Sequence, residues 1–224
     1  MDFTLLKRDG MSIRSAALGL FATNCYVVRC EETGAVAIID SSGEAEVIAK
    51  MTADAGNNVT HLLQTHAHID HVAALTQTKA AHSAAPIVIH KDEMFLYDAA
   101  PMQAQMFGIS TEPLPRPDQF IDEGETVTLG ALTAKVMLTP GHTPGSICFW
   151  FEAQDVVFSG DLLFAGSIGR TDLPGGDTPT IMLSLARVAQ DLPDSTLVLS
   201  GHGPETTIGL EKKRNPFLHM ALGR

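Results

Sequence analysis

The sequence contains few cysteines. There are three, Cys25, Cys30 and Cys148. Their number is odd and they form no CxxC pair, which argues against a disulfide framework. Cys25 and Cys148 lie in apolar, strand-like runs, so we expect them to be small core residues. This cysteine usage fits a reducing compartment, and we expect a cytoplasmic protein.

Basic residues and long apolar runs are also scarce. The 15 lysines and arginines are outnumbered by 26 aspartates and glutamates, giving a net charge of -11. This charge argues against a general nucleic-acid or membrane-surface binder, because both need a basic face. No apolar run reaches the length of a membrane span, and the N-terminal MDFTLLKRDG lacks a signal-peptide pattern. An anionic small substrate stays compatible, because bound metal ions would supply positive charge.

The remaining composition is that of a globular protein. The chain has 224 residues, of which 45% are hydrophobic and 18% charged, so it can bury a sizeable core. Each half has β-rich runs followed by helical stretches, and no Gly/Ser-rich linker separates the halves. We therefore expect one domain over residues 1–224, of class α/β (α+β), with two packed sheets and helices outside.

Local patterns predict the elements in more detail. Strands are expected at 19–29, 35–40, 59–65, 86–90, 126–129, 132–138, 146–151, 155–159 and 196–200. Helices are expected near 44–55, 71–80, 92–107, 178–190 and 205–214. The three prolines of 111–118 predict an irregular connector. The Met- and Phe-containing segment 92–107 could line a substrate entrance or pack in the core, and we favour the core.

The clearest chemical signal is THAHIDH at residues 65–71. It places His66, His68, Asp70 and His71 within a few residues of one another. Imidazole and carboxylate groups are ligands of first-row metals. In an extended run, residues i and i+2 point the same way, so His66 and His68 can hold one ion. Asp70 and His71 follow the turn and could reach a second ion.

Matching residues recur downstream, each after a predicted strand, where loops carry functional sites. His142 lies in TPGHTPGS, Asp161 in FSGDLLF and His202 in LSGHGPETT. Asp40, in AIIDSS, could orient a ligand histidine or cap the next helix. We read the remaining histidines as core or surface residues: His61, His82, His90 and His219.

Seven ligands suffice for two divalent metal ions. We expect the first ion to be held by His66, His68 and His142. We expect the second to be held by Asp70, His71 and His202, with Asp161 as the bridge. Zinc is the default metal for such mixed ligands, with iron or manganese as alternatives.

The motifs also carry a family resemblance. THAHIDH, followed by His142, Asp161 and His202, resembles the HxHxDH pattern of the metallo-β-lactamase superfamily. GSIGRTDLPGGD (166–177) and SGHGPETTIGLEKKRNPFL (200–218) resemble the glyoxalase II branch, especially its short bacterial form. The resemblance implies a four-layer αββα sandwich with the metals at one edge of the sheets. It also implies hydrolysis of S-lactoylglutathione, or of a similar hydroxyacyl-glutathione thioester, to an acid and glutathione.

Departures from that family concern mainly the substrate. Long glyoxalase II enzymes carry a C-terminal helical domain that supplies glutathione contacts, and we expect this protein to lack it. Two loop positions that carry lysine and tyrosine in those enzymes correspond by counting to Arg170 and Asp172. Arg170 could keep a cationic contact to a substrate carboxylate, whereas Asp172 cannot replace the tyrosine.

A water shared by two divalent ions would be hydroxide near neutral pH and could attack a thioester carbonyl. Asp70 is the expected catalytic residue, because it could orient this nucleophile. The alternative is an iron-dependent persulfide dioxygenase acting on glutathione persulfide, which would use His66, His142 and Asp161. The GHGPETT segment favours the hydrolase, because it supplies His202 to a second metal. A β-lactamase is less favoured, because Asp161 stands where those enzymes usually have cysteine or serine.

Overall fold

A computed structural model describes residues 3–109 and 111–223 of the chain. Its first sheet contains seven strands in chain order: β1 (Thr4–Arg8), β2 (Met11–Leu18), β3 (Thr23–Cys30), β4 (Val36–Ile39), β5 (Val59–Leu63), β6 (Ile87–Ile89) and β7 (Gln119–Phe120). The strands from β1 to β4 pair antiparallel, and those from β4 to β7 pair parallel. The carboxyl ends of β4 and β5 therefore lie at the same edge of this sheet.

The second sheet is assembled from the C-terminal half. Its order is β15 (Thr206–Thr207), β14 (Leu197–Ser200), β11 (Val156–Gly160), β10 (Ile147–Phe151), β9 (Leu132–Leu138) and β8 (Thr126–Leu129). Strands β11 and β14 run parallel, so the loops that follow them leave the sheet at one edge. A small hairpin, β12 (Leu163–Phe164) and β13 (Ser167–Ile168), comes directly after β11.

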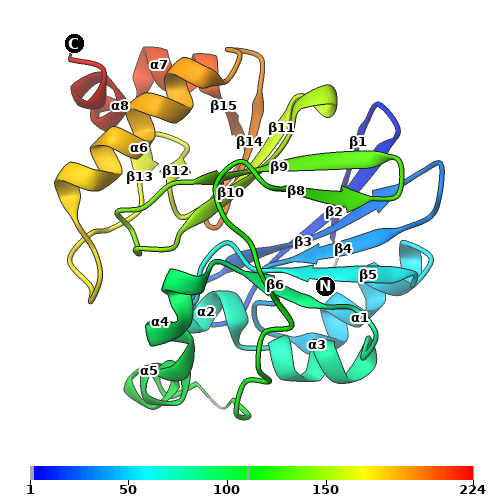
Figure 1. Cartoon of the computed structure of the whole chain (residues 1–224). Helices are drawn as coiled ribbons and strands as arrows, with labels where there is room; N and C mark the ends of the chain where they lie inside the picture. Colours follow the sequence, from blue (N-terminus) through cyan, green and yellow to red (C-terminus); the bar gives the residue numbers. More distant parts are fainter. Residues whose placement is uncertain (1–2, 110, 224) are drawn as a thin grey trace.

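Helices cover the outer faces of both sheets (Figure 1). Those of the N-terminal half are α1 (Ala45–Asp54), α2 (Ile69–Val72), α3 (Leu75–Ala81), α4 (Met94–Asp98) and α5 (Ala100–Phe107). Those of the C-terminal half are α6 (Thr178–Asp191), α7 (Ile208–Arg214) and α8 (Pro216–Ala221). Two 3₁₀ turns, η1 (Lys91–Glu93) and η2 (Glu152–Gln154), complete the helical elements among the described residues.

Three apolar clusters hold these layers together. The central cluster joins inward-facing residues of the two sheets, such as Val28 and Ile39 of the first and Phe149 and Phe158 of the second. A second cluster lies between the first sheet and its helices, and a third lies between the second sheet and α6 to α8. Burial on both faces explains why β4, β10 and β11 are apolar at nearly every position. The expected αββα sandwich is confirmed.

Most expected elements are present, and the differences have local causes. The elements not expected from the sequence include helix α8 and six strands, namely β1, β2, β7, β12, β13 and β15. The helix expected over 92–107 is divided into η1, α4 and α5, with Pro101 in the first turn of α5, where its missing N–H costs nothing. The helix expected over 71–80 is divided into α2 and α3.

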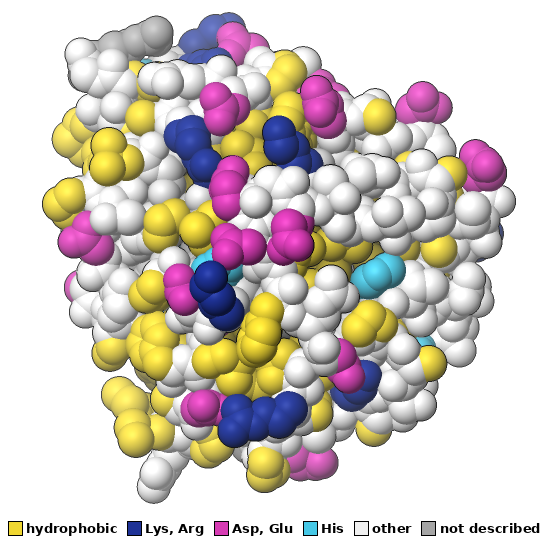
Figure 2. All heavy atoms as spheres, in the orientation of Figure 1, with side chains coloured by type: hydrophobic (Ala, Val, Ile, Leu, Met, Phe, Trp, Pro, Cys, Tyr) yellow, Lys and Arg dark blue, Asp and Glu magenta, His cyan; other side chains and the backbone are white. Residues whose placement is uncertain are grey.

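Two surface properties bear on possible partners. No helix in the described part of the chain is long and apolar enough to cross a membrane. On the face drawn in Figure 2, basic side chains lie singly among acidic and apolar ones, while apolar side chains gather over α4 and α5. This face has no continuous basic patch of the kind that nucleic acid would require.

Candidate metal centre

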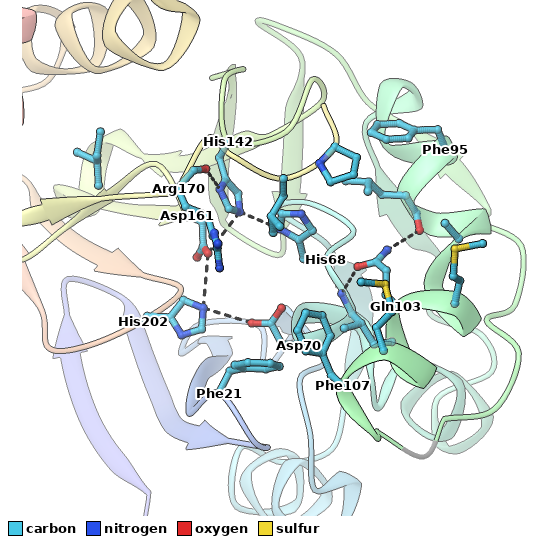
Figure 3. Close-up of a pocket in the computed structure, with 18 of the residues that line it drawn as sticks. Phe21, His68, Asp70, Phe95, Gln103, Phe107, His142, Asp161, Arg170 and His202 are labelled. Atoms are coloured by element: carbon cyan, nitrogen blue, oxygen red, sulfur yellow. Dashed lines mark hydrogen bonds and ion pairs between the residues drawn. The ribbon is translucent and has the colours of Figure 1, made fainter. Parts of the chain in front are cut away.

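The predicted ligand residues meet at one edge of the two sheets (Figure 3). His66 and His68 lie in the loop after β5, and the short helix α2 carries Asp70 and His71. The remaining members come from loops of the second sheet, after β9, β11 and β14: His142, Asp161 and His202. The site is therefore assembled from both halves of the chain.

Three histidines form the first group. His66, His68 and His142 each offer a ligand atom, and these atoms lie within 4.8 Å of one another. His68 Nδ1 is 2.9 Å from His142 Nε2, and all three side chains are buried. This is the first set expected from the sequence, and its geometry suits one metal ion.

The second group combines one carboxylate with two histidines. Asp70, His71 and His202 likewise place ligand atoms within 4.8 Å of one another. His202 Nε2 is 3.2 Å from Asp70 Oδ2. Asp161 lies between the groups, with Oδ2 3.5 Å from His142 Nε2 and 3.5 Å from His202 Nε2. It thus lies beside residues of both groups, and its role as a bridging ligand stays a prediction.

Three of the candidate ligand histidines have a hydrogen-bonding partner at Nδ1, which leaves Nε2 to face the site. Asp40 Oδ2 lies 2.8 Å from His71 Nδ1, and the Arg170 carbonyl oxygen lies 2.7 Å from His142 Nδ1. Thr65 Oγ1 lies 3.1 Å from His66 Nδ1. Such contacts fix the ring and its tautomer, so that the other nitrogen can face a metal. Of the two interpretations open for Asp40, orientation of a histidine is the one observed, since the residue at the start of α1 is Glu44.

The histidines of the two groups differ in their pKa values. Burial lowers the pKa of His66 well below its ordinary value, and burial and the neighbouring His142 lower that of His68 to about 3. Burial also lowers the pKa of His142. These three rings are therefore neutral and have lone pairs available, which metal binding requires.

The second group combines cationic histidines with carboxylates. Burial opposes charge on His71, yet Asp70 and Asp161 raise its pKa well above the ordinary value. Hydrogen bonds to Asp161 and Asp70 outweigh burial and raise the pKa of His202 to about 9. The pKa of Asp161 is held well below its ordinary value, because His71 outweighs the cost of its burial. A divalent cation would take the place of the protons on these histidines.

The cluster fits metal ions by two further observations. His66 Nε2 is buried and makes no hydrogen bond to any residue that the structure describes, while its Nδ1 is held by Thr65. Buried polar atoms normally have partners, so this nitrogen indicates a ligand. A Cβ added at Gly201 would lie 2.1 Å from Asp161 Oδ1 and 2.7 Å from His71 Cε1. The glycine thus leaves the space in which these side chains approach one another.

Two supporting residues were not found from the sequence. Glu93 is fully buried, and its oxygens accept hydrogen bonds from the backbone N–H groups of Ala67 at 2.7 Å and Gly145 at 2.8 Å. Thr23 Oγ1 donates a hydrogen bond to Asp70 Oδ2 at 2.7 Å. Neither residue belongs to a motif, and only the pairing of distant segments brings them to the site.

A cavity of about 490 Å³ opens from the cluster. Arg170 lines it, as expected for a residue that contacts substrate, but its guanidinium is paired with Asp172 by two hydrogen bonds of 2.7 and 2.8 Å. Met102 and Met106 line the opposite wall with exposed fractions of 66% and 74%. The preference for a core role of segment 92–107 is therefore wrong for these residues, because α5 turns only one face to the core.

The other sequence expectations stand as follows. The described residues contain a third group that could hold a metal ion, formed by His66, His71 and Asp161. None of the three groups includes His61, His82, His90 or His219. All three cysteines are free and buried, and Cys25 and Cys148 lie in β3 and β10, as expected for small core residues. The connector 111–118 contributes nothing to the lining of the cavity in its described residues.

An αββα sandwich with a His/Asp cluster at the edge of its sheets defines a class of metal-dependent enzymes, and the comparisons agree. The family model described as Metallo-beta-lactamase superfamily matches residues 18–202. The chain therefore belongs to the metallo-β-lactamase superfamily.

Three relatives illustrate the similarity. The chain is 39% identical to hydroxyacylglutathione hydrolase GloC of Haemophilus influenzae, over 93% of this chain and 99% of that protein. The structure of BLEG-1 B3 metallo-beta-lactamase has a TM-score of 0.85 and 35% identity, covering 92% of this chain and 99% of that one. The structure of TTHA1623 in a di-iron-bound form has a TM-score of 0.82 and 38% identity, covering 90% and 98%.

Proposed function

We propose that the protein is a metal-dependent thioesterase of the glyoxalase II type, which hydrolyses a hydroxyacyl-glutathione to a hydroxy acid and glutathione. The observation that carries the proposal is the complete set of seven His and Asp side chains around the shared carboxylate Asp161. The similarity to the hydroxyacylglutathione hydrolase of Haemophilus influenzae supports the choice of a thioester.

The proposed ligands are those expected from the sequence: His66, His68, Asp70, His71, His142, Asp161 and His202. Two divalent ions held there would supply Lewis acidity, which lowers the pKa of water toward neutrality and polarises a carbonyl. Zinc is the default. Iron is the main alternative, supported by the relative solved in a di-iron-bound form.

The chain's own residues position the reactants. Asp70 would accept a hydrogen bond from the attacking water and hold its lone pair toward the thioester carbonyl. Thr23 fixes the Asp70 carboxylate for this task through its 2.7 Å hydrogen bond. The water oxygen would bond to the acyl carbon, the C–S bond would break, and one proton of that water would pass to the departing thiolate, giving the hydroxy acid and free glutathione. Arg170 would contact a glutathione carboxylate, exchanging its contact with Asp172.

The alternative is a persulfide dioxygenase with one iron on His66, His142 and Asp161. The geometry of the second group favours the hydrolase, because His202 reaches within 3.2 Å of Asp70 and completes a second set of ligands. The two activities differ in a simple observable, since only the dioxygenase consumes oxygen.

The test combines metal analysis with thiol release from S-lactoylglutathione. Metal-loaded protein should release thiol without oxygen uptake, and glutathione persulfide should cause no oxygen uptake. A parallel assay with a β-lactam covers the activity named for BLEG-1. Replacement His68→Ala should abolish thioester hydrolysis with little loss of fold, whereas His82→Ala, remote from the cluster, should retain it. Full activity in a folded, metal-depleted His68→Ala protein would refute the proposal.

A further inference from the structure

The wall of the cavity opposite Arg170 is apolar and belongs to α4 and α5. Phe95, Met102, Met106 and Phe107 all line the cavity, and each has at least 42% of its surface exposed. Large apolar side chains at such exposure are costly to leave in water, so a concentration of them beside a reactive site indicates a binding surface. Figure 3 shows Phe95 and Phe107 on the side of this wall.

Phe21 extends this wall toward the metal ligands. It comes from the turn between β2 and β3, and its ring meets that of Phe107 edge to face at a centroid distance of 5.1 Å. Both rings lie beside Asp70 in the close-up (Figure 3). The apolar surface is thus continuous with the place where a reacting carbonyl would sit.

The wall is also attached to the metal-binding loop. Gln103 of α5 accepts a hydrogen bond from the backbone N–H of Ile69 at 3.0 Å. Its amide nitrogen donates to the Leu96 carbonyl oxygen of α4 at 2.9 Å. These contacts fix α4 and α5 relative to the loop that carries the candidate ligands. A group bound on the wall is therefore positioned relative to the reacting atoms.

The two sides of the cavity differ in whether they carry a cationic side chain. Arg170 is the one arginine or lysine among the described residues that line it, and it lies on the side of the β13 loop rather than on the α5 wall. The two carboxylates of a glutathione moiety find no cation on the α5 wall, where burying a charge would be costly. The acyl half of a thioester is uncharged and can occupy that wall.

We propose that the α4–α5 wall is an apolar subsite for the acyl group, and that the preferred substrates are 2-hydroxyacyl thioesters with an extended alkyl or aryl acyl chain rather than the lactoyl thioester. This inference rests on the proposed thioester hydrolysis and adds its acyl specificity. Each acyl methylene buried on the wall should raise kcat/KM roughly fourfold.

The experiment compares thioesters that share glutathione as the thiol, so that contacts to the thiol half stay constant. The acyl group of S-(2-hydroxyhexanoyl)glutathione has three more methylenes than that of S-lactoylglutathione, so its kcat/KM should be roughly 60-fold higher when all three are buried. In the double variant Met102→Gln/Met106→Gln this ratio should fall several-fold. Leu183→Gln is the matched control, because Leu183 is 73% exposed on α6, away from the cavity, and it should leave the ratio unchanged.

A binding measurement separates specificity from catalysis. S-hexylglutathione and S-methylglutathione are thioethers without a carbonyl to hydrolyse, and calorimetry gives their affinities. The hexyl compound should bind more tightly, and the double variant should lose that advantage. Equal turnover of both thioesters, with equal binding of both thioethers, would overturn the subsite and leave the proposed hydrolase intact. Wall-dependent binding of the hexyl compound without hydrolysis of any thioester would support the subsite and refute the hydrolase.

Discussion

The buried carboxylate of Glu93 joins the two loops that carry the histidines of the first group. One oxygen accepts the N–H of Ala67, which lies between His66 and His68, and the other accepts the N–H of Gly145, in the loop of His142. Replacement Glu93→Gln keeps the size of the side chain but exchanges one acceptor oxygen for an NH₂ donor. One of the two N–H groups must then lose its partner.

The magnitude follows from the number of bonds lost. A hydrogen bond to a charged group contributes about 1.5–3 kcal/mol, so Glu93→Gln should lower the free energy of unfolding by that amount. Glu93→Ala removes both acceptors and should cost about twice as much, before any cavity is counted. Because the two loops are no longer held together, metal affinity should fall roughly 10- to 100-fold in Glu93→Gln.

Glu211 provides a matched control. It is also buried, and it accepts hydrogen bonds from Gly166 N, Thr206 Oγ1 and Asn215 Nδ2 at 2.6–2.9 Å, without contacting either ligand loop. Glu211→Gln should therefore lower stability by a similar amount while leaving metal affinity nearly unchanged. Urea unfolding of the metal-free proteins measures stability, and chelator competition measures metal affinity. An unchanged metal affinity in Glu93→Gln, or an equal loss in Glu211→Gln, would contradict the reasoning.

Two further predictions concern the ligand cradle and acid stability. Gly201→Ala places a Cβ 2.1 Å from Asp161 Oδ1 and should abolish metal content and activity. In Gly203→Ala the added Cβ meets no atom within 4 Å, so metal content and activity should be retained. The free energy of unfolding should fall by about 1–2 kcal/mol, because Gly203 has a left-handed backbone conformation. The hydrogen bond from Glu123 N lowers the folded-state pKa of Asp122 to about 2, which is below its unfolded value. The ionised Asp122 therefore stabilises the folded protein above about pH 4, and this stabilisation is lost as the pH falls toward 2. Asp122→Asn should flatten the loss of stability over that range in urea titrations at stepped pH; an unchanged slope would contradict this assignment.

Local patterns predicted the elements that depend on short-range order. The apolar runs of β4, β10 and β11 and the helix α6 appear close to their expected bounds, because a strand buried on both faces and an amphipathic helix leave direct signals in composition and period. The division of 92–107 was missed because its helical propensity is continuous up to Pro101. The extent of the domain over residues 1–224 stays a prediction.

The grouping of the candidate metal ligands could be expected from the sequence because their motifs are local, while their role as ligands stays a prediction. His66 and His68 are two positions apart after a strand, and Asp70 and His71 follow them directly. His142, Asp161 and His202 each come after a separate strand, so the residue types and positions already limited the possible site. The proposed glyoxalase II type of chemistry rests on other local segments, 166–177 and 200–218.

Only the tertiary structure decided which partners those residues have. Asp40 lies 2.8 Å from His71, which distinguishes between the two interpretations of that residue. Glu93 lies between two loops that are far apart in the chain. The tertiary structure also turned Met102 and Met106 toward the cavity and paired Arg170 with Asp172. A sequence states which groups are available, but contacts between segments distant in the chain depend on how the two sheets pack, and that packing determines which groups meet.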